Sequence, residues 1–350
     1  MANFIPWSGL FADDPFWQEH FVTTGRRLTQ EFRGSPDAAP GDGASAPHDF
    51  HLRLTRRFGP AAGLAGKRAR LFLRYPVEGG ASLLLAPPRV SAPDGARIRT
   101  GTDRLEVMLT ADAGLIEVAA DYQIRCAPAA LGHVAALPVA ERALYLQPRE
   151  GLIQITPRIA ALAEALGGPE RNPLELAEGF RDFIHGTLIC GVLRYDLIPH
   201  DSPLDWVLQH RWFDCQLGSA LLAALCRARN VPARLCAGHL LYRHAPTFHY
   251  WVEIWCPDTG WRGFDLLSWT LSVAGRDADW RGIFSGTLDP RLQTETLPRH
   301  FTGMGSASLP ARWHLLLTPH ADGAETRICE RETGTLAVSD RLSFRPPAPA

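Results

Sequence analysis

The chain has 350 residues, of which 46% are apolar and 21% are charged, and its formal net charge is -1. This length allows two or three domains, and the composition is that of an ordinary soluble globular protein. The nearly balanced charge excludes a general electrostatic attraction to nucleic acid or to anionic lipid, so neither is expected as a partner.

Residues 1–48 are predicted to be an N-terminal arm followed by a linker. The first 33 residues carry aromatic side chains such as Phe4, Trp7 and Trp17, which can pack on the main body. Residues 34–48 are rich in Pro, Gly and Ala, a composition that cannot bury a core and favours a flexible linker or long loop. The chain start shows no basic stretch followed by an apolar run, so no secretory signal is expected.

Residues 49–135 are predicted to form a β-rich domain. The segment contains short runs in which apolar and polar residues alternate, and turns with Gly and Pro separate these runs. Four such runs at this spacing favour a small antiparallel sandwich. The runs are residues 51–56, 69–75, 104–109 and 115–125.

Residues 136–305 are predicted to form a second domain that begins with helices. Thr156-Pro157 and Asn172-Pro173 each combine a helix N-cap residue with Pro at the first helical position. A third helix is predicted to begin at Cys215, because the apolar residues that follow recur with the spacing of one helical face. Three strands are then expected at 234–242, 249–255 and 261–264, and residues 306–350 are assigned to a C-terminal extension.

Cys215 is the candidate nucleophile. It falls in the first turn of the third helix, where the partial positive charge and the unpaired N–H groups of a helix N-terminus can stabilise a thiolate. Cys226 lies well inside the same helix and serves as the structural comparison. A first-turn cysteine alone is more often structural than catalytic, so the assignment depends on a base and an orienting group.

His249 and Asp265 are the candidate base and orienting group. His249 opens the second predicted strand, residues 256–260 have the composition of a hairpin turn, and the third strand ends at Asp265. A turn centred near Pro257 sets Asp265 almost directly across from His249, roughly 5 Å away. The alternative is that His249 is a hydrogen-bonded strand residue and that Asp265 is a turn or capping residue.

Residues 212–270 resemble the transglutaminase-like superfamily of thiol enzymes, in particular its bacterial members of the cysteine protease type. The matching pieces are Asp-Cys-Gln-Leu-Gly-Ser at 214–219, Val-Pro-Ala-Arg at 231–234, His-Tyr-Trp-Val-Glu-Ile-Trp at 249–255 and Gly-Trp-Arg-Gly-Phe-Asp at 260–265. Together with the upstream helices and the β-rich segment, the resemblance covers roughly residues 50–305. One departure is Asp265-Leu-Leu-Ser, where many relatives have Pro after the aspartate.

The resemblance implies an α+β protein with a transglutaminase-like, papain-like cysteine catalytic domain after a β-rich, sandwich-like domain. It also implies that Cys215 is the nucleophile, His249 the general base and acid, and Asp265 the orienting residue. Gln209 and Trp212, six and three positions before Cys215, are weak candidates for an oxyanion donor beside the Cys215 backbone N–H.

Glu253 shares a strand face with His249 and either braces the site or has a structural role. Arg234 is expected to make a structural ion pair or hydrogen bonds to carbonyls. No cofactor is expected, because phosphate-binding and dinucleotide-binding motifs are missing from the sequence. No metal is expected either, because the spacing of His239, His244 and His249 fits no usual zinc pattern.

The expected activity is thiol-dependent acyl transfer at amide bonds through an acyl-enzyme thioester. Water as acceptor gives a peptidase or amidase, and a primary amine gives a transamidase, so the partners are a peptide or protein acyl donor and an amine. An amide synthase that uses a carrier-bound thioester and a non-catalytic binding module remain alternatives. The seven cysteines have irregular spacing and no Cys-x-x-Cys pair, and a chain this long needs no disulfides, so a cytoplasmic location is expected.

Overall fold

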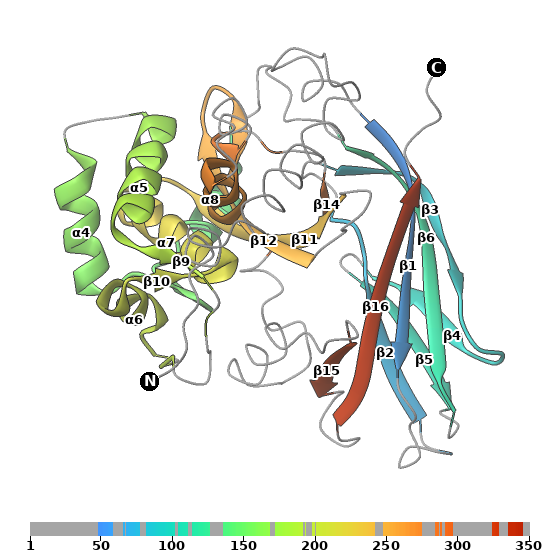
Figure 1. Cartoon of the computed structure of the whole chain (residues 1–350). Coiled ribbons are helices and arrows are strands. Elements are labelled where there is room, and N and C mark those ends of the chain that lie inside the picture. Colours follow the sequence, from blue (N-terminus) through green and yellow to red (C-terminus); the bar gives the residue numbers. More distant parts are fainter. Residues whose placement is uncertain are drawn as a thin grey trace. The chain divides into compact units, whose positions relative to one another are not determined.

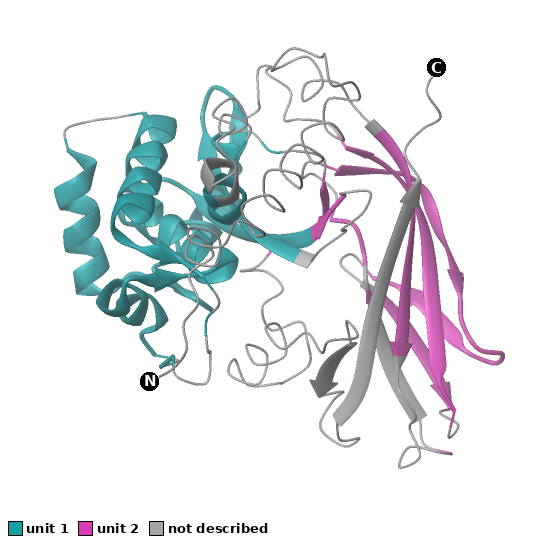
Figure 2. Ribbon diagram, viewed as in Figure 1, with its two compact units in different colours: residues 1–46, 127–238, 247–290 teal, residues 47–126, 239–246, 291–350 magenta. Residues whose placement is uncertain are grey.

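The computed structural model divides the chain into two compact units (Figure 2). Unit 1 comprises residues 1–46, 127–238 and 247–290, and unit 2 comprises residues 47–126, 239–246 and 291–350. The predicted N-terminal arm lies outside the described residues, and the predicted domain boundaries stay predictions. The described residues are 48–58, 66, 68–77, 82–101, 104–110, 114–126, 136–168, 172–191, 193, 198–199, 201–241, 248–274, 284–286, 288, 291–296, 324–328 and 335–345.

Unit 2 is β-rich, as expected from the alternating runs (Figure 1). One sheet has the strand order β15-β16-β1-β6-β3 and the other β2-β5-β4, and the pairings within both are antiparallel. The long strand β16 pairs with β1, so a segment expected in the C-terminal extension contributes to this sheet. The strands of this unit are β1 (His48–Phe58), β2 (Arg68–Arg74), β3 (Ser82–Ser91), β4 (Arg97–Thr100), β5 (Arg104–Thr110), β6 (Ile116–Cys126), β14 (Arg291–Thr296), β15 (Ala324–Ile328) and β16 (Thr335–Arg345).

The core of unit 2 lies between these two sheets. Leu54 on β1 and Val118 on β6 are fully buried, and they share one hydrophobic cluster with Leu73 on β2 and Val107 on β5. The other face of the first sheet carries exposed cross-strand ion pairs such as Arg53–Asp121. The alternation of apolar and charged residues along β1 and β6 therefore produces a sandwich with one packed and one solvated face per sheet.

Unit 1 combines helices with short strands. Three of its strands lie in one sheet in the order β13-β12-β11. Strands β12 and β13 pair antiparallel, and α7 packs against β12. Two further pairs of short strands, β7 with β8 and β9 with β10, complete the described strands of this unit. The elements are α3 (Val139–Leu144), β7 (Arg149–Glu150), β8 (Ile153–Gln154), α4 (Pro157–Gly167), α5 (Pro173–Thr187), β9 (Ile189–Cys190), α6 (Pro203–His210), β10 (Trp212–Phe213), α7 (Cys215–Ala228), β11 (Ala233–Leu240), β12 (Phe248–Cys256), β13 (Gly260–Phe264) and α8 (Leu266–Ala274).

The helix starts follow the capping signals in the sequence. Thr156 caps α4 by accepting from the Ile159 N–H, and Asn172 caps α5 by accepting from the Glu175 N–H. Each cap satisfies one of the N–H groups that the first helical turn leaves without a partner. The three predicted helix starts at residues 157, 173 and 215 are confirmed.

The α7 helix is buried along most of its length, with the residues from Gln216 to Arg227 all inaccessible. Gly218 allows this close packing, because a Cβ there would lie 2.4 Å from the ring of Phe213 and 3.1 Å from Leu266. Asn230, two residues after the end of the helix, adopts the left-handed conformation at a φ of 60°. A helix buried on all sides holds its first residue in a fixed position, which is what a reactive side chain requires.

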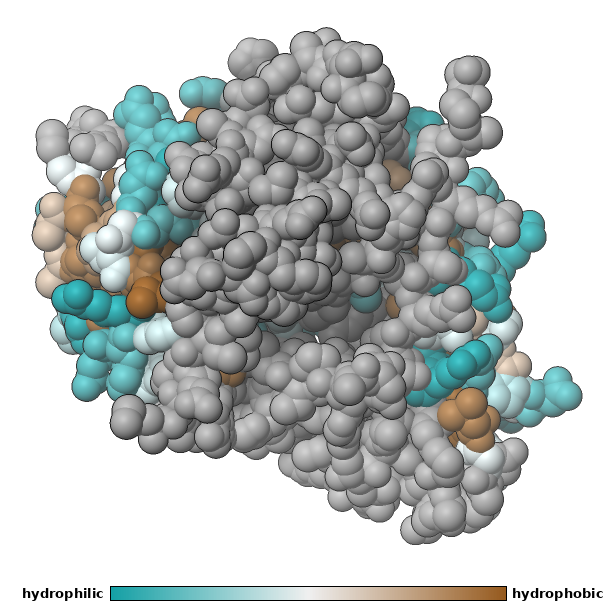
Figure 3. Space-filling view, in the orientation of Figure 1, coloured by the Kyte–Doolittle hydropathy of each residue, from teal (hydrophilic) through white to brown (hydrophobic). Residues whose placement is uncertain are grey.

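Unit 1 also exposes apolar side chains on its edge. Figure 3 shows hydrophobic surface over α4 on the face drawn, where Ala160, Ala161 and Ala165 are exposed. Single exposed alanines in a helix reflect their high helix propensity and need no partner.

Candidate active site

Cys215 is the first residue of α7, directly after the N-cap residue Asp214. The Asp214 carboxylate accepts hydrogen bonds from the N–H groups of Gln216 and Leu217, at 3.1 and 2.8 Å. Cys215 is partly exposed, whereas the other five described cysteines are buried. Among the described thiols, Cys215 is therefore the accessible one.

His249 and Asp265 are brought together as the sequence predicts. His249 Nε2 lies 2.8 Å from Asp265 Oδ2, and both side chains are buried. Because an ionised carboxylate only accepts hydrogen bonds, the imidazole proton resides on Nε2 and the lone pair of Nδ1 is left to act as a base. This tautomer is the one that a thiol nucleophile needs from its histidine.

The hairpin that carries this pair differs from the prediction in its register. Val252 pairs with Phe264 and Cys256 with Gly260, so the turn is centred at Asp258 and not near Pro257. Thr259 N–H donates to the Cys256 carbonyl, and Gly260, with a φ of 74°, begins β13. Asp265 therefore reaches His249 diagonally, not from the directly opposite position.

Asp265 is also the capping residue of α8, which combines the two roles that the sequence left as alternatives. Its Oδ1 accepts from the backbone N–H of Ser268 at 2.9 Å, and its Oδ2 accepts from the Ser268 hydroxyl at 2.8 Å. Its own N–H donates to the Phe284 carbonyl at 3.2 Å. Ser268 was not predicted as part of the site, although an Asp at a helix start is a capping signal that points to the backbone N–H three residues ahead.

The sulfur of Cys215 lies at the start of β12, where the backbone N–H of Tyr250, the residue after His249, donates to it. Burial is the largest influence and raises the pKa of the Cys215 thiol well above its usual value, and the carboxylate of Asp214 adds to this. The Tyr250 N–H lowers that pKa, and Asp265 and Cys190 raise it further. Although part of the residue is accessible, its sulfur is packed closely enough for desolvation to dominate.

The electrostatics thus differ from the expectation of a thiolate stabilised by the helix terminus. The N–H groups of Gln216 and Leu217 are already bound to the Asp214 carboxylate, whose negative charge opposes a second anion nearby. A raised pKa disfavours a resting thiolate, so the thiol needs a base to become a nucleophile.

A second thiol, that of Cys190, lies close enough to Cys215 to affect its pKa. Cys190 on β9 is the register partner of Phe213 on β10, two residues before Cys215. Both Cys190 and Phe213 are buried, and burial raises the pKa of the Cys190 thiol far above its usual range. Cys190 is an inert packing residue at neutral pH.

The two oxyanion candidates lie on the segment that leads to Cys215. Gln209 is exposed near the end of α6, and Trp212 is partly buried on β10. Arg211, between them, adopts a left-handed conformation with a φ of 59° and ends α6. Both residues stay candidates. Trp212 lies three residues before Cys215, and its backbone is fixed by the pairing of β10 with β9.

Glu253 has a structural partner, and none of its described hydrogen bonds is made to His249. Its Oε2 binds Arg234 Nε at 2.7 Å and Nη2 at 2.6 Å, and both side chains are buried. Trp261 stacks under the Arg234 guanidinium at 4.1 Å. The expectation of a structural ion pair for Arg234 is confirmed, and burial of this pair is compensated by its two hydrogen bonds.

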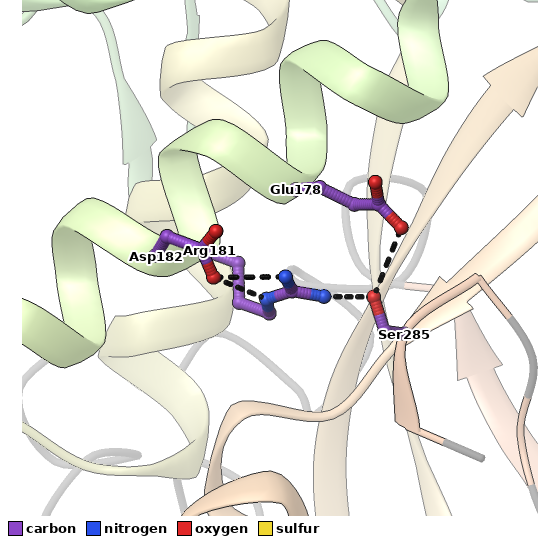
Figure 4. Close-up of polar contacts among 4 residues, drawn as sticks. All are labelled: Glu178, Arg181, Asp182 and Ser285. Atoms are coloured by element: carbon purple, nitrogen blue, oxygen red, sulfur yellow. Dashed lines mark hydrogen bonds and ion pairs between the residues drawn. The ribbon is translucent and has the colours of Figure 1, made fainter. Parts of the chain in front are cut away.

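A second layer of polar contacts surrounds the segment that binds the Asp265 backbone (Figure 4). Arg181 on α5 donates to the Ser285 hydroxyl and to Asp182, and Ser285 donates to Glu178 at 3.5 Å. Ser285 also bridges to Phe264, the last residue of β13. Helix α5 therefore anchors the segment at residues 284–285, which in turn binds the backbone of Phe264 and Asp265.

Two further properties concern the described residues as a whole. No group of three or more His, Cys, Asp and Glu side chains is arranged there to hold a metal ion. None of the helices in the described ranges is long and apolar enough to cross a membrane.

Comparison with known proteins agrees with this geometry. The sequence model described as the transglutaminase-like superfamily matches residues 160–266, from α4 to the start of α8. No curated protein is similar enough in sequence to match the chain. Residues 160–266 include Cys215, His249 and Asp265, so the match spans the whole candidate site.

One solved structure shares this fold over most of its length. The structure named as a putative cysteine protease from Cytophaga hutchinsonii is 13% identical, with a TM-score of 0.53 over 87% of this chain and 93% of that chain. The periplasmic domain of TgpA from Pseudomonas aeruginosa is 19% identical, with a TM-score of 0.38 over 69% of this chain and 94% of that chain. Residues 160–266 of this chain thus match the transglutaminase-like superfamily in sequence, and the chain shares its fold with the structure from Cytophaga hutchinsonii.

Proposed function

We propose that the protein is a thiol enzyme that transfers acyl groups from amide bonds through a Cys215 thioester. The observation that carries the proposal is the buried hydrogen bond between His249 Nε2 and Asp265 Oδ2, on the hairpin whose first strand also contacts the Cys215 sulfur. A histidine with a fixed tautomer, beside the accessible thiol at the first position of a helix, has the parts of a nucleophile–base–orienter unit.

In the proposed reaction, His249 Nδ1 takes the proton of the Cys215 thiol as the sulfur attacks the acyl carbon of the donor. The new C–S bond forms, the oxyanion collapses, and the C–N bond breaks as the imidazolium gives its proton to the leaving amine. The acceptor then attacks the thioester, His249 takes the proton of the acceptor, and the sulfur leaves. Asp265 stabilises the imidazolium in both halves.

The raised pKa of the Cys215 thiol supports a mechanism in which proton transfer accompanies attack. A neutral resting thiol reacts only when His249 removes its proton, which ties reactivity to a bound acyl donor. The acceptor decides between peptidase or amidase activity with water and transamidase activity with a primary amine. A carrier-bound thioester as donor gives the amide synthase, and a chain that forms no adduct is the binding module.

The test is an acyl-donor screen with intact-mass detection of an adduct on Cys215. Glutamine-containing and other peptides, simple amides and thioesters serve as donors, each with and without a labelled primary amine. The chain suits this assay, because Lys67 is its one lysine and self-labelling through lysine side chains is confined to that residue. Cys215→Ala should abolish adduct formation.

Cys226→Ala is the matched control, since Cys226 lies in the same helix and is fully buried. This control should form the adduct at the rate of the unmodified chain. Adduct formation that persists in Cys215→Ala, or the lack of any adduct with every donor class, would overturn the proposal.

A further inference from the structure

We infer that Ser268 is a positioning residue, which fixes the Asp265 carboxylate so that this group can hold His249. The inference rests on the proposed function for its consequence in catalysis, but its structural part concerns only these three residues. Ser268 is the third residue of α8, and its side chain is buried beside that of Asp265.

Among the described residues, Ser268 donates two hydrogen bonds to the Asp265 carboxylate, and His249 donates another. The Ser268 hydroxyl and His249 Nε2 both donate to the same oxygen, Oδ2, each at 2.8 Å. The Ser268 backbone N–H donates to the other oxygen, Oδ1, at 2.9 Å. The two contacts from Ser268 bind both carboxylate oxygens and prevent the carboxylate from rotating away from the imidazole.

The contact with the hydroxyl goes beyond the needs of helix capping. The cap of α8 is the bond from the Ser268 backbone N–H to Oδ1, and any residue at position 268 except Pro supplies this donor. The hydroxyl binds Oδ2, the oxygen that His249 uses. Removal of the hydroxyl therefore leaves the helix cap intact and affects the carboxylate where it meets His249.

Burial strengthens the hydrogen bond between the Ser268 hydroxyl and Asp265. Asp265 is fully buried and His249 nearly so, so water does not readily replace a lost donor at Oδ2. Hydrogen bonds to an ionised group are stronger than those between neutral groups. At metal sites, removal of a partner that orients a histidine in the same way typically changes activity about 10–100-fold, and we expect an effect of this order here.

The experiment is histidine-selective ¹⁵N NMR on the full chain, which reports on the His249 Nε2–H without any substrate. The chain has 13 histidines, and the resonance is assigned by its loss in His249→Gln. In Ser268→Ala we expect the Nε2–H resonance to shift and its exchange with water to become about tenfold faster. Ser268→Thr keeps the hydroxyl and should retain the unmodified signal and exchange rate.

Thr156→Ala is the control for a general loss of helix capping. Thr156 caps α4 through its side chain, away from the site, so its loss should lower the thermal midpoint and leave the His249 signal unchanged. An unmodified His249 signal in Ser268→Ala, or the same change in Thr156→Ala, would overturn the inference. Ser268→Cys, with a weaker donor of similar size, replaces Ser268→Ala if that variant does not fold, and it should give an intermediate exchange rate.

Turnover separates this inference from the proposed function. With any donor that forms the Cys215 adduct, Ser268→Ala should lower kcat about tenfold with little change in KM, and Ser268→Thr should restore it. A changed His249 signal in a chain that forms no adduct with any donor would leave the positioning role intact and remove the proposed function. Normal kcat in Ser268→Ala would overturn the inference and leave the proposed function standing.

Discussion

Asp265 binds His249 through a 2.8 Å hydrogen bond, although the two residues are not opposite one another in the β12–β13 hairpin. Val252 is the register partner of Phe264, so Asp265 comes after the last paired residue of β13 and starts α8. The carboxylate reaches His249 from a helix cap, a position that fixes both of its oxygens. A catalytic carboxylate supported from two sides needs no further reorganisation when positive charge develops on the imidazole.

Asp265→Asn is expected to lower turnover by about 10⁴-fold, because an amide neither fixes the Nε2–H tautomer nor stabilises the imidazolium. The thermal midpoint should change little, since the Asn side-chain oxygen still accepts the Ser268 backbone N–H that caps α8. A paired measurement of kcat and thermal unfolding checks this. Unchanged turnover in the folded variant would remove Asp265 from the catalytic set.

Asp214→Asn is expected to speed the alkylation of Cys215 at neutral pH. The Asp214 charge raises the pKa of the Cys215 thiol, so its removal lowers this pKa and increases the thiolate fraction, about tenfold for each unit. Asn is an equally good N-cap, so α7 should stay intact. The measurement is the iodoacetamide labelling rate between pH 6 and 10, with labelled peptides quantified by mass spectrometry.

His249→Ala should have the opposite effect on this labelling, because the base is lost. Cys226 should label slowly in every variant, since it is fully buried and burial raises the pKa of its thiol far above its usual range. Slower labelling of Cys215 in Asp214→Asn would contradict the prediction that the Asp214 charge raises the pKa of the Cys215 thiol.

Gly218→Ala is expected to destabilise the protein by about 1–3 kcal/mol, because the new methyl group overlaps the ring of Phe213. Gly186→Ala on α5 is the matched control, with no atom within 4 Å of the added carbon. That substitution should be neutral or stabilise by about 0.5–1 kcal/mol through helix propensity. Urea unfolding of the two variants measures the difference, and equal effects would show that Phe213 moves freely.

Glu253→Ala is expected to cost about 3–5 kcal/mol, because it leaves the buried Arg234 guanidinium without its counter-charge. The double variant Arg234→Met/Glu253→Leu should cost less than Glu253→Ala, since no isolated charge stays buried. Chemical denaturation gives the free energies of unfolding. A small loss in the single variant would mean that solvent or another group compensates Arg234.

Arg181→Ala is expected to destabilise the protein by about 1.5–3 kcal/mol, because it removes the donor to Ser285 and the cation stacked 5.8 Å from Trp269. Asp182→Asn tests the exposed half of the same cluster and should change stability by less than about 0.5 kcal/mol. Thermal unfolding distinguishes the two. Equal losses would show that the Arg181–Asp182 pair, and not the anchoring of Ser285, stabilises this region.

Local signals in the sequence determined the helix starts and indicated Cys215 as the candidate nucleophile. Thr156, Asn172 and Asp214 cap their helices through hydrogen bonds to residues two or three positions ahead, so a short window contains the whole interaction. The same window placed Cys215 at the first position of α7. Strand β3 was not among the predicted runs. It continues through Pro87 and Pro88 with register shifts, although proline donates no hydrogen bond to a sheet.

Only the tertiary structure decided how these residues interact. The β12–β13 register depends on whether the turn is centred at Pro257 or at Asp258, and the composition of residues 256–260 does not distinguish these two positions. The raised pKa of the Cys215 thiol comes from burial and from carboxylates that the fold brings near the sulfur, whereas the sequence showed only the helix terminus. Ser285 meets Arg181 across 104 residues of chain, and β16 meets β1 from the far end of the sequence. Contacts of this kind form because the whole chain folds to bury its apolar surface, and no local pattern records which distant polar groups that folding brings together.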